Sequence, residues 1–501
     1  MEDRKGLYRN NMQSAWRRPQ LREPTFADRL SSVLALDFRP MAGRPLPAEV
    51  QPRTFSIEPA AVLDAYSLRE AIRLLGLPSI VGANTPLDEL RGLVQFAVTV
   101  EHGLMVQYLY ASYAAKDSNS RDVLRSIAIE EMGHLLTVLN LLVALDAPIH
   151  MGRYDANLDR IFDPFPFKLE KVTAEVIAKF TACERPDDQH VDPEERPLLP
   201  EILDAARKSA GVTPARVGLL YTKIYWLLRP TDDPLPNEPW HDYPLDEIIK
   251  ECPKDWHVRP FPVTNPADRE GGEPWKNQLS DVLVGSVTSA EEALQGIAGL
   301  TAQGEGFGAG NDAHFDRFVA LYSTFKQNPD PTRAVPKDPW YQGAAGAQGE
   351  AADEISSEPA RLLAIAFDQL YEFLLLSIAI FFDHSDSQNP NARKVLTAAA
   401  LGGMKRCIGA LARQLVNMDR HAGTPDGRSA APCFKLPADS PEDATARKLR
   451  LLEVANLCAK TGNDIAAHPD VPLLVRAAAK DAFKEFNKHK QAIEQLFGPM
   501  A

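Results

Sequence analysis

The segment Arg121–Pro148 constrains the fold of this chain more than any other stretch. It reads RDVLRSIAIEEMGHLLTVLNLLVALDAP, an apolar helix with acids and a histidine set into it. Steps of three and four residues place Glu131 and His134 on the stripe that a helix turns towards the core. A buried carboxylate without a partner costs several kcal/mol, so this one requires a cation or dense hydrogen bonding. Because Glu131 and His134 lie one turn apart on one face, both can reach a single ion. Glu130 is the second choice for the carboxylate, since its face is one step off the stripe.

A second long helix is predicted directly before this one. Residues 85–116 open with the capping signature TPLDE and continue with helical periodicity, which places Glu101 on the buried stripe. The polar turn at 117–120 is short, so the two helices are antiparallel neighbours. Glu101 lies about as far before this turn as Glu131 and His134 lie after it. We therefore predict that these three side chains meet inside a helical bundle.

The rest of the chain predicts more helices and no strands. Residues 1–60 are rich in arginine and proline and predict an extended arm, and residues 155–280 are a proline-rich insertion that covers one end of the bundle. We expect three parts: the arm at 1–60, a helical bundle with its insertion at 61–436, and a C-terminal helical pair packed on the bundle at 437–501. The helices expected after residue 150 are at 173–182, 213–228, 288–305, 312–325, 358–382, 392–418, 444–460 and 471–496.

The composition limits the classes of partner. A net charge of -13 disfavours nucleic acid and anionic membranes, because both would repel the chain. The five cysteines are scattered without a CxxC pair, which favours reduced thiols in a cytoplasmic protein over a zinc or disulfide framework. The N-terminal residues lack the apolar core of a secretory signal. The longest apolar run, around Phe373–Phe382, is too short and too close to charges for a bilayer span to be expected.

Several motifs together resemble a known family. They are EHGLMVQYLYASYA, IAIEEMGHLLTVLNLLVAL, FDPFPFKLEKVT, AQGEGFGAGNDAHFDRF and the AAPCF loop, in this order between residues 86 and 436. They are similar to the ferritin-like domain family that includes the iminophenyl-pyruvate dimer synthases of the violacein and rebeccamycin pathways. The resemblance implies an all-α fold, a ferritin-like four-helix bundle with additional C-terminal helices and the proline-rich insertion.

The resemblance also implies a set of metal ligands. Glu101 matches the acid of the first helix, and Glu131 with His134 matches the ExxH pair of the second. Glu305 matches the acid of the QGEG segment, and His314 matches the histidine that opens the next helix. The acidic position two residues before it, Asp312, is a further ligand candidate.

One departure from the ferritin-like pattern leaves the number of ions open. A symmetrical two-iron site would have a second ExxH, but Asn311 stands three residues before His314. Two ions are expected if Asp312 or Glu372 completes a second half-site, and one ion if neither does.

Other polar residues have simpler interpretations. His102 is expected to face outwards beside Glu101, and Tyr108 can donate a hydrogen bond to the site or simply pack. Glu238 and His241 also spell ExxH, but a proline-rich loop does not put them on one helical face. Glu305 and His314 can also serve as ordinary helix-end residues.

Carboxylate and imidazole ligands suit iron or manganese and tolerate zinc. The leading hypothesis is a metal-dependent, non-haem iron oxidoreductase or oxidative coupling enzyme that acts with dioxygen on a small amino-acid-derived substrate. One alternative is an imine-dimerising synthase with a structural metal. Another is a non-catalytic metal-binding scaffold. A homo-oligomer or a contact with a pathway enzyme is compatible with each of them.

Overall fold

The computed structural model describes the chain between residues 68 and 498, with gaps. The predicted arm at 1–60 lies outside the described residues and stays a prediction. The described ranges are 68–80, 83–149, 151–153, 164–187, 190–212, 214–229, 248–250, 252, 255–262, 284, 287–305, 313–328, 331–345, 349–383, 390–422, 428–437, 441 and 443–498.

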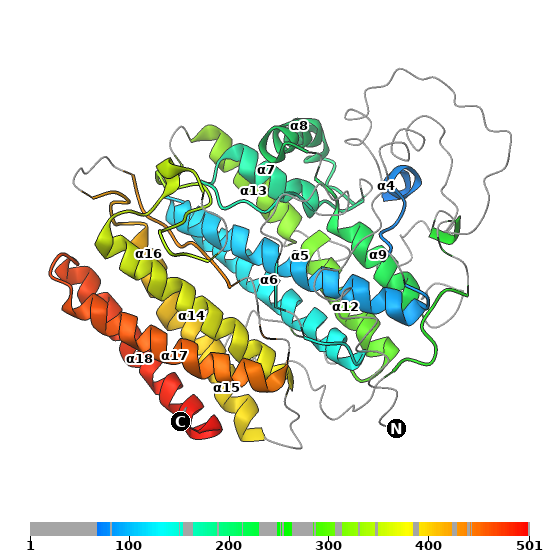
Figure 1. The fold of residues 1–501 in the computed structure, drawn as a ribbon. Helices are drawn as coiled ribbons and strands as arrows, with labels where there is room; N and C mark the ends of the chain where they lie inside the picture. Colours follow the sequence, from blue (N-terminus) through cyan, green and yellow to red (C-terminus); the bar gives the residue numbers. More distant parts are fainter. Residues whose placement is uncertain are drawn as a thin grey trace.

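Two long helices form the centre of the fold (Figure 1). Helix α5 spans Pro86–Ala114, α6 spans Ser118–Ala144, and the two pack along each other. The side chains of Thr85 and Asp117 cap their N-termini by accepting hydrogen bonds from backbone amides three residues on, at 3.1 and 2.7 Å. Both helices are buried on nearly every side, as expected for helices without a wide polar face.

Shorter helices complete the bundle around this pair (Figure 1). Helix α7 (Ala174–Cys183) packs against α8 (Leu199–Ala210) and α13 (His314–Gln327). Helix α9 (Val217–Leu228) packs against α5 and α12 (Ala290–Glu305). Helices α12 and α13 both contact α6.

Two of these helices change the interpretation of the insertion at 155–280. Helix α9 packs directly on α5, and α7 packs on α13. This segment therefore builds part of the bundle wall and does more than cover one end. A separate short helix, α4 (Leu68–Leu75), lies near the start of the described chain.

The C-terminal helices form a second group that lies along the first (Figure 1). They pack mainly against one another, and α14 also contacts α6. Its members are α14 (Glu358–Asp383), α15 (Pro390–Gly402), the π-helical stretch Gly403–Ile408, α16 (Gly409–Leu415), α17 (Ala444–Ala467) and α18 (Leu473–Phe497).

The predicted secondary structure agrees well with the observed elements. The described residues contain no strand, and their β pairings are isolated bridges such as that between Ala115 and Thr332. The helices expected at 358–382 and 471–496 are observed within two residues of their predicted ends. The one expected at 444–460 continues to Ala467.

Among the described residues, three helices are long and apolar enough to cross a membrane by length and composition, which corrects the expectation for Phe373–Phe382. These are Ser118–Ala144, Glu358–Asp383 and Asn391–Leu415. The run Phe373–Phe382 is short, but the helix that contains it, Glu358–Asp383, stays apolar over a longer stretch. In this fold 89% of the apolar window of the first helix and 83% of the second are buried inside the protein.

Candidate metal centre

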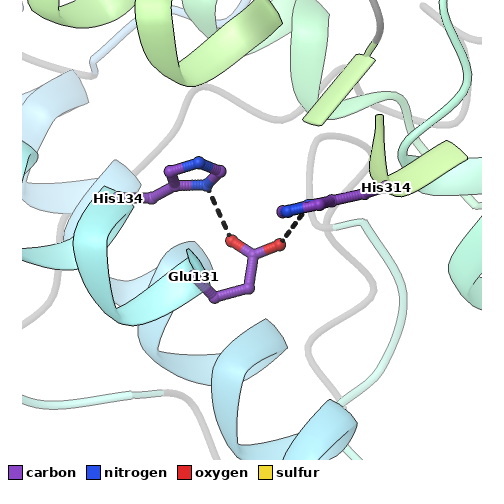
Figure 2. A group of neighbouring side chains, drawn as sticks. All are labelled: Glu131, His134 and His314. Atoms are coloured by element: carbon purple, nitrogen blue, oxygen red, sulfur yellow. Dashed lines mark hydrogen bonds and ion pairs between the residues drawn. The ribbon is translucent and has the colours of Figure 1, made fainter. Parts of the chain in front are cut away.

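Glu131 of α6 lies between two histidines (Figure 2). Its Oε2 is 2.9 Å from Nδ1 of His134, one turn further along the same helix. Its Oε1 is 2.9 Å from Nδ1 of His314, the first residue of α13. All three side chains are buried, and their ligand atoms lie within 4.8 Å of one another. These three residues could therefore hold one metal ion between them.

Glu101 of α5 extends the cluster on the side of His134. Its Oε2 is 3.7 Å from Nδ1 of His134, and its Oε1 accepts a hydrogen bond from the hydroxyl of Tyr221 in α9. The carboxylate is buried. The structure therefore brings together Glu101, Glu131 and His134, as their spacing predicted.

Glu184 extends the cluster on the side of His314, and sequence reasoning missed it. It caps the C-terminus of α7, with Oε2 3.9 Å from Nδ1 of His314. The hydroxyl of Tyr108 donates to its Oε1 at 2.7 Å. The arrangement mirrors that of Glu101: each carboxylate accepts from a tyrosine with one oxygen and turns the other towards a histidine.

The five donors divide into two half-sites that share Glu131. One half-site contains Glu101, Oε2 of Glu131 and His134, and the other contains Glu184, Oε1 of Glu131 and His314. Glu131 has one oxygen in each half-site, so it would help to hold a metal ion in either of them. Among the described residues, Glu184 is a candidate for the position that the sequence left open, while Asp312 lies outside them.

Both histidines are held with Nδ1 towards the cluster. Nε2 of His134 is 3.0 Å from Oε1 of Gln303, and the amide nitrogen of Gln303 donates to Glu130 at 3.0 Å. Nε2 of His314 is 3.0 Å from Oε2 of Glu130. Both partner oxygens can only accept, so each Nε2 carries a proton and Nδ1 faces Glu131. Burial opposes the charged form of both rings, but the charge of Glu131 raises their pKa, so Nδ1 is also protonated in the metal-free protein and a metal ion would replace that proton. Metal-binding histidines usually donate their second ring N–H in this way.

Glu130, the second choice for the carboxylate, therefore orients the site from outside. Arg317 of α13 donates two N–H groups to it, one of them at 2.8 Å. Burial opposes ionisation of Glu130, but the hydrogen bonds from His314 and Arg317 lower its pKa to about 2. The carboxylate stays charged and fixes the imidazole of His314.

The charges and lone pairs of the cluster fit a cation. Burial raises the pKa of Glu101 to about 8 and that of Glu184 to about 7, and the charge of Glu131 adds to both shifts. Burial acts on Glu131 too, but the charges of His134 and His314 outweigh it and hold its pKa well below the ordinary range. Oε1 of Glu131 and Nδ1 of His314 lie 2.9 Å apart without hydrogen-bond geometry, and neither has another hydrogen-bond partner in the described chain. These two buried atoms face one space and would suit a shared ion once Nδ1 of His314 gives up its proton.

A small cavity adjoins the donors. It is about 10 Å³, measured as the space open to the centre of a water-sized sphere, which is room for about one water molecule. Gly304 of α12 forms part of its wall, and a Cβ atom there would lie 3.0 Å from Oε2 of Glu184. The cavity is lined by Glu101, Leu104, Glu131, His134, Glu184, Val217, Tyr221, Leu300, Thr301 and Gly304.

The remaining sequence candidates lie elsewhere or outside the described residues. Asp312 is outside them, as is the side chain of Glu305, the last residue of α12. Glu238 and His241 are also outside. Glu372 is not in the cluster, because both of its oxygens accept hydrogen bonds from Arg450 of α17, at 2.6 and 2.9 Å.

The prediction that His102 faces outwards is wrong. Its side chain is fully buried, and its Nε2 contacts the hydroxyl of Tyr371 in α14. The second helical group covers this side of α5, which a periodicity argument for one helix does not reveal.

Comparison with known families identifies the domain that contains this cluster. Residues 94–323 match a family model described as ferritin-like, and the match includes all five donors. The region at 94–323 is thus similar to ferritin-like domains. The predicted all-α ferritin-like fold is thereby confirmed for this region.

The chain is also similar to a named enzyme. It is 24% identical over 456 residues to the dichlorochromopyrrolate synthase of Lentzea aerocolonigenes. The alignment covers 78% of this chain and 41% of the relative, so the chain spans about two-fifths of the relative's length. No solved structure matches the chain significantly. The similarity supports the family resemblance seen in the motifs.

Proposed function

We propose that this chain is a metal-dependent enzyme, with non-haem iron, that oxidises or oxidatively couples a small amino-acid-derived molecule. The proposal rests mainly on the convergence of five buried donors, with Glu131 between two histidines at 2.9 Å from each. It is supported by the ferritin-like match and by the relative, whose name describes the synthesis of a small organic molecule.

The donor set decides which metals suit the site. Carboxylates and imidazoles without thiolates favour iron or manganese and tolerate zinc. Iron held by these residues would supply the electrons for reduction of dioxygen. The protein positions the ligands. Glu131 belongs to both half-sites, and Tyr221 and Tyr108 each donate a hydrogen bond that fixes one oxygen of Glu101 and of Glu184, respectively.

The size of the cavity favours a second candidate function. The cavity holds about one water molecule, so an amino-acid-derived substrate does not fit beside the donors in this conformation. The second candidate is therefore a coupling synthase in which the metal does not contact the organic substrate. The printed name of the relative, a synthase, is compatible with it.

Oxygen uptake by defined metal forms separates these candidates. The protein is prepared metal-free and then loaded anaerobically with Fe(II), Mn(II) or Zn(II). Each form is supplied with 2-imino acids made from aromatic amino acids, and dioxygen consumption and coupled products are followed. The proposal predicts uptake and product only with a redox metal, and loss of both in Glu131→Gln. Product formation by the metal-free protein would establish the second candidate, and no product from any form would refute both.

A further inference from the structure

A second buried polar cluster joins α9 to α5. Nζ of Lys223 in α9 lies 3.2 Å from Sγ of Cys252 and 3.2 Å from Oε1 of Glu89 in α5. The other oxygen of Glu89 accepts a hydrogen bond from the indole N–H of Trp256. Lys223 and Glu89 are each 3% exposed and Cys252 is 1% exposed. None of these residues belongs to the candidate metal centre.

The pairing of an amine with a thiol is the unusual part of this cluster. A lysine is rarely buried without a counter-charge, and Glu89 provides that charge. A thiol is only a weak acceptor for an ammonium group, so hydrogen bonding alone does not account well for the choice of cysteine. Cysteine does add a reactive sulfur, since its oxidation product, the sulfenic acid, reacts with nearby nucleophiles.

We propose that Lys223 and Cys252 form an oxygen-bridged crosslink, Nζ–O–Sγ, when the protein is exposed to peroxide. Nζ and Sγ are 3.2 Å apart, so they need to move only slightly closer for one oxygen atom to link them. A direct nitrogen–sulfur bond would require these two atoms to come much closer. The crosslink is a modification site separate from the metal centre, and it does not depend on the proposed function.

The chemistry balances with two molecules of hydrogen peroxide. In the first step the thiol attacks one peroxide, which gives the sulfenic acid and one water. In the second step the ammonium group of Lys223 gives one proton to Glu89, the sulfenic oxygen forms its bond to Nζ, and a second peroxide is reduced to water; two waters leave and one hydrogen remains on nitrogen. Sulfur and nitrogen each lose two electrons. The linked pair has gained one oxygen and lost two hydrogens.

The crosslink would fix the segment around Cys252 to α9 covalently. This segment already meets the end of α9 through the amide of Val258, which donates to the carbonyl of Leu227 at 2.8 Å. Helix α9 also carries Tyr221, whose hydroxyl donates to Glu101. Oxidation at Cys252 therefore stiffens the helix that positions one carboxylate of the metal centre.

Peptide mass spectrometry tests the crosslink directly. The full chain, freed of metal, is titrated with hydrogen peroxide, digested with trypsin and analysed before and after treatment with dithiothreitol. We expect one linked peptide pair containing Lys223 and Cys252, with a mass gain of about 14 Da for one oxygen gained and two hydrogens lost. Trypsin should no longer cleave after Lys223, and dithiothreitol should restore both peptides.

Three variants make the result decisive. Cys252→Ser and Lys223→Arg should abolish the linked pair, and Lys223→Arg keeps the charge beside Glu89. Cys458, equally buried in α17, is the matched control, so Cys458→Ser should leave the crosslink unchanged. The proposal is overturned if Cys252 oxidises to sulfinic or sulfonic acid without linkage, or if the pair loses two hydrogens without gaining oxygen. It is equally overturned if Cys252 stays a free thiol at peroxide levels that oxidise the methionines.

Discussion

Replacing Gly304 by alanine tests the role of Glu184 with a single methyl group. The new Cβ would lie 3.0 Å from Oε2 of Glu184, whereas ordinary contacts are 3.4–4 Å. Glu184 has little room to move, because Tyr108 holds its other oxygen and the adjoining cavity is only about 10 Å³. Overpacking of this kind costs about 1–3 kcal/mol. It is partly offset by up to about 1 kcal/mol from removing a helical glycine.

Gly299 provides the matched control on the same helix. A Cβ there meets nothing within 4 Å, so Gly299→Ala should stabilise the metal-free protein by about 0.5–1 kcal/mol. Gly304→Ala should be less stable than Gly299→Ala by about 1–3 kcal/mol in urea unfolding. It should also bind the second Mn(II) ion at least about tenfold more weakly in calorimetry, because Glu184 is displaced. If both variants match in stability and metal binding, Glu184 is not held where we describe it.

Three further predictions concern the charges of the centre. Glu131→Gln breaks a buried ion pair with two histidines. In urea unfolding of the metal-free protein, it should lower the free energy of unfolding by about 3–5 kcal/mol. An unchanged urea midpoint would contradict the pairing. Metal ions bind only deprotonated ligands, and in the metal-free protein the pKa is about 7 for Glu184, about 8 for Glu101 and about 9 for His314. Binding at neutral pH should therefore release protons, and affinity should rise from about pH 6 to about pH 9; calorimetric heats that do not depend on the buffer would refute this. Glu372→Gln weakens only the ion pair with Arg450 of α17, so it should lower the free energy of unfolding by about 1 kcal/mol and leave metal binding unchanged. Loss of bound metal in this variant would instead show that Glu372 is a ligand.

The central pair of helices and half of the centre could be predicted from sequence. Apolar periodicity around Glu101, Glu131 and His134 sets the buried face, and the short turn between α5 and α6 sets their relative depth. Helix periodicity and loop length, which are both local features of the sequence, are enough to predict the buried face and the relative depth of the two helices. Spacing alone left His314 equally balanced between a ligand and a helix-end residue, because a helix start offers no periodic stripe, and the family motif favoured the ligand role.

Glu184 and His102 show where local rules fail. Glu184 follows the last turn of α7, so no helical stripe marks it, and only tertiary packing of α7 on α13 brings it to His314. A weak signal was present: a lone acid directly after a buried apolar helix. His102 was misjudged because the stripe argument assumes one exposed face. Helix α5 instead has neighbours on every side, among them Tyr371 from a distant part of the chain.

Metal stoichiometry tests the central claim most directly. Metal-free protein is loaded anaerobically with excess Fe(II), desalted and analysed by plasma mass spectrometry together with its protein concentration. The two half-sites predict about two iron ions per wild-type chain and fewer than about one in Glu131→Gln. A wild-type chain that retains no iron, or a Glu131→Gln variant that retains as much as wild type, would contradict the account.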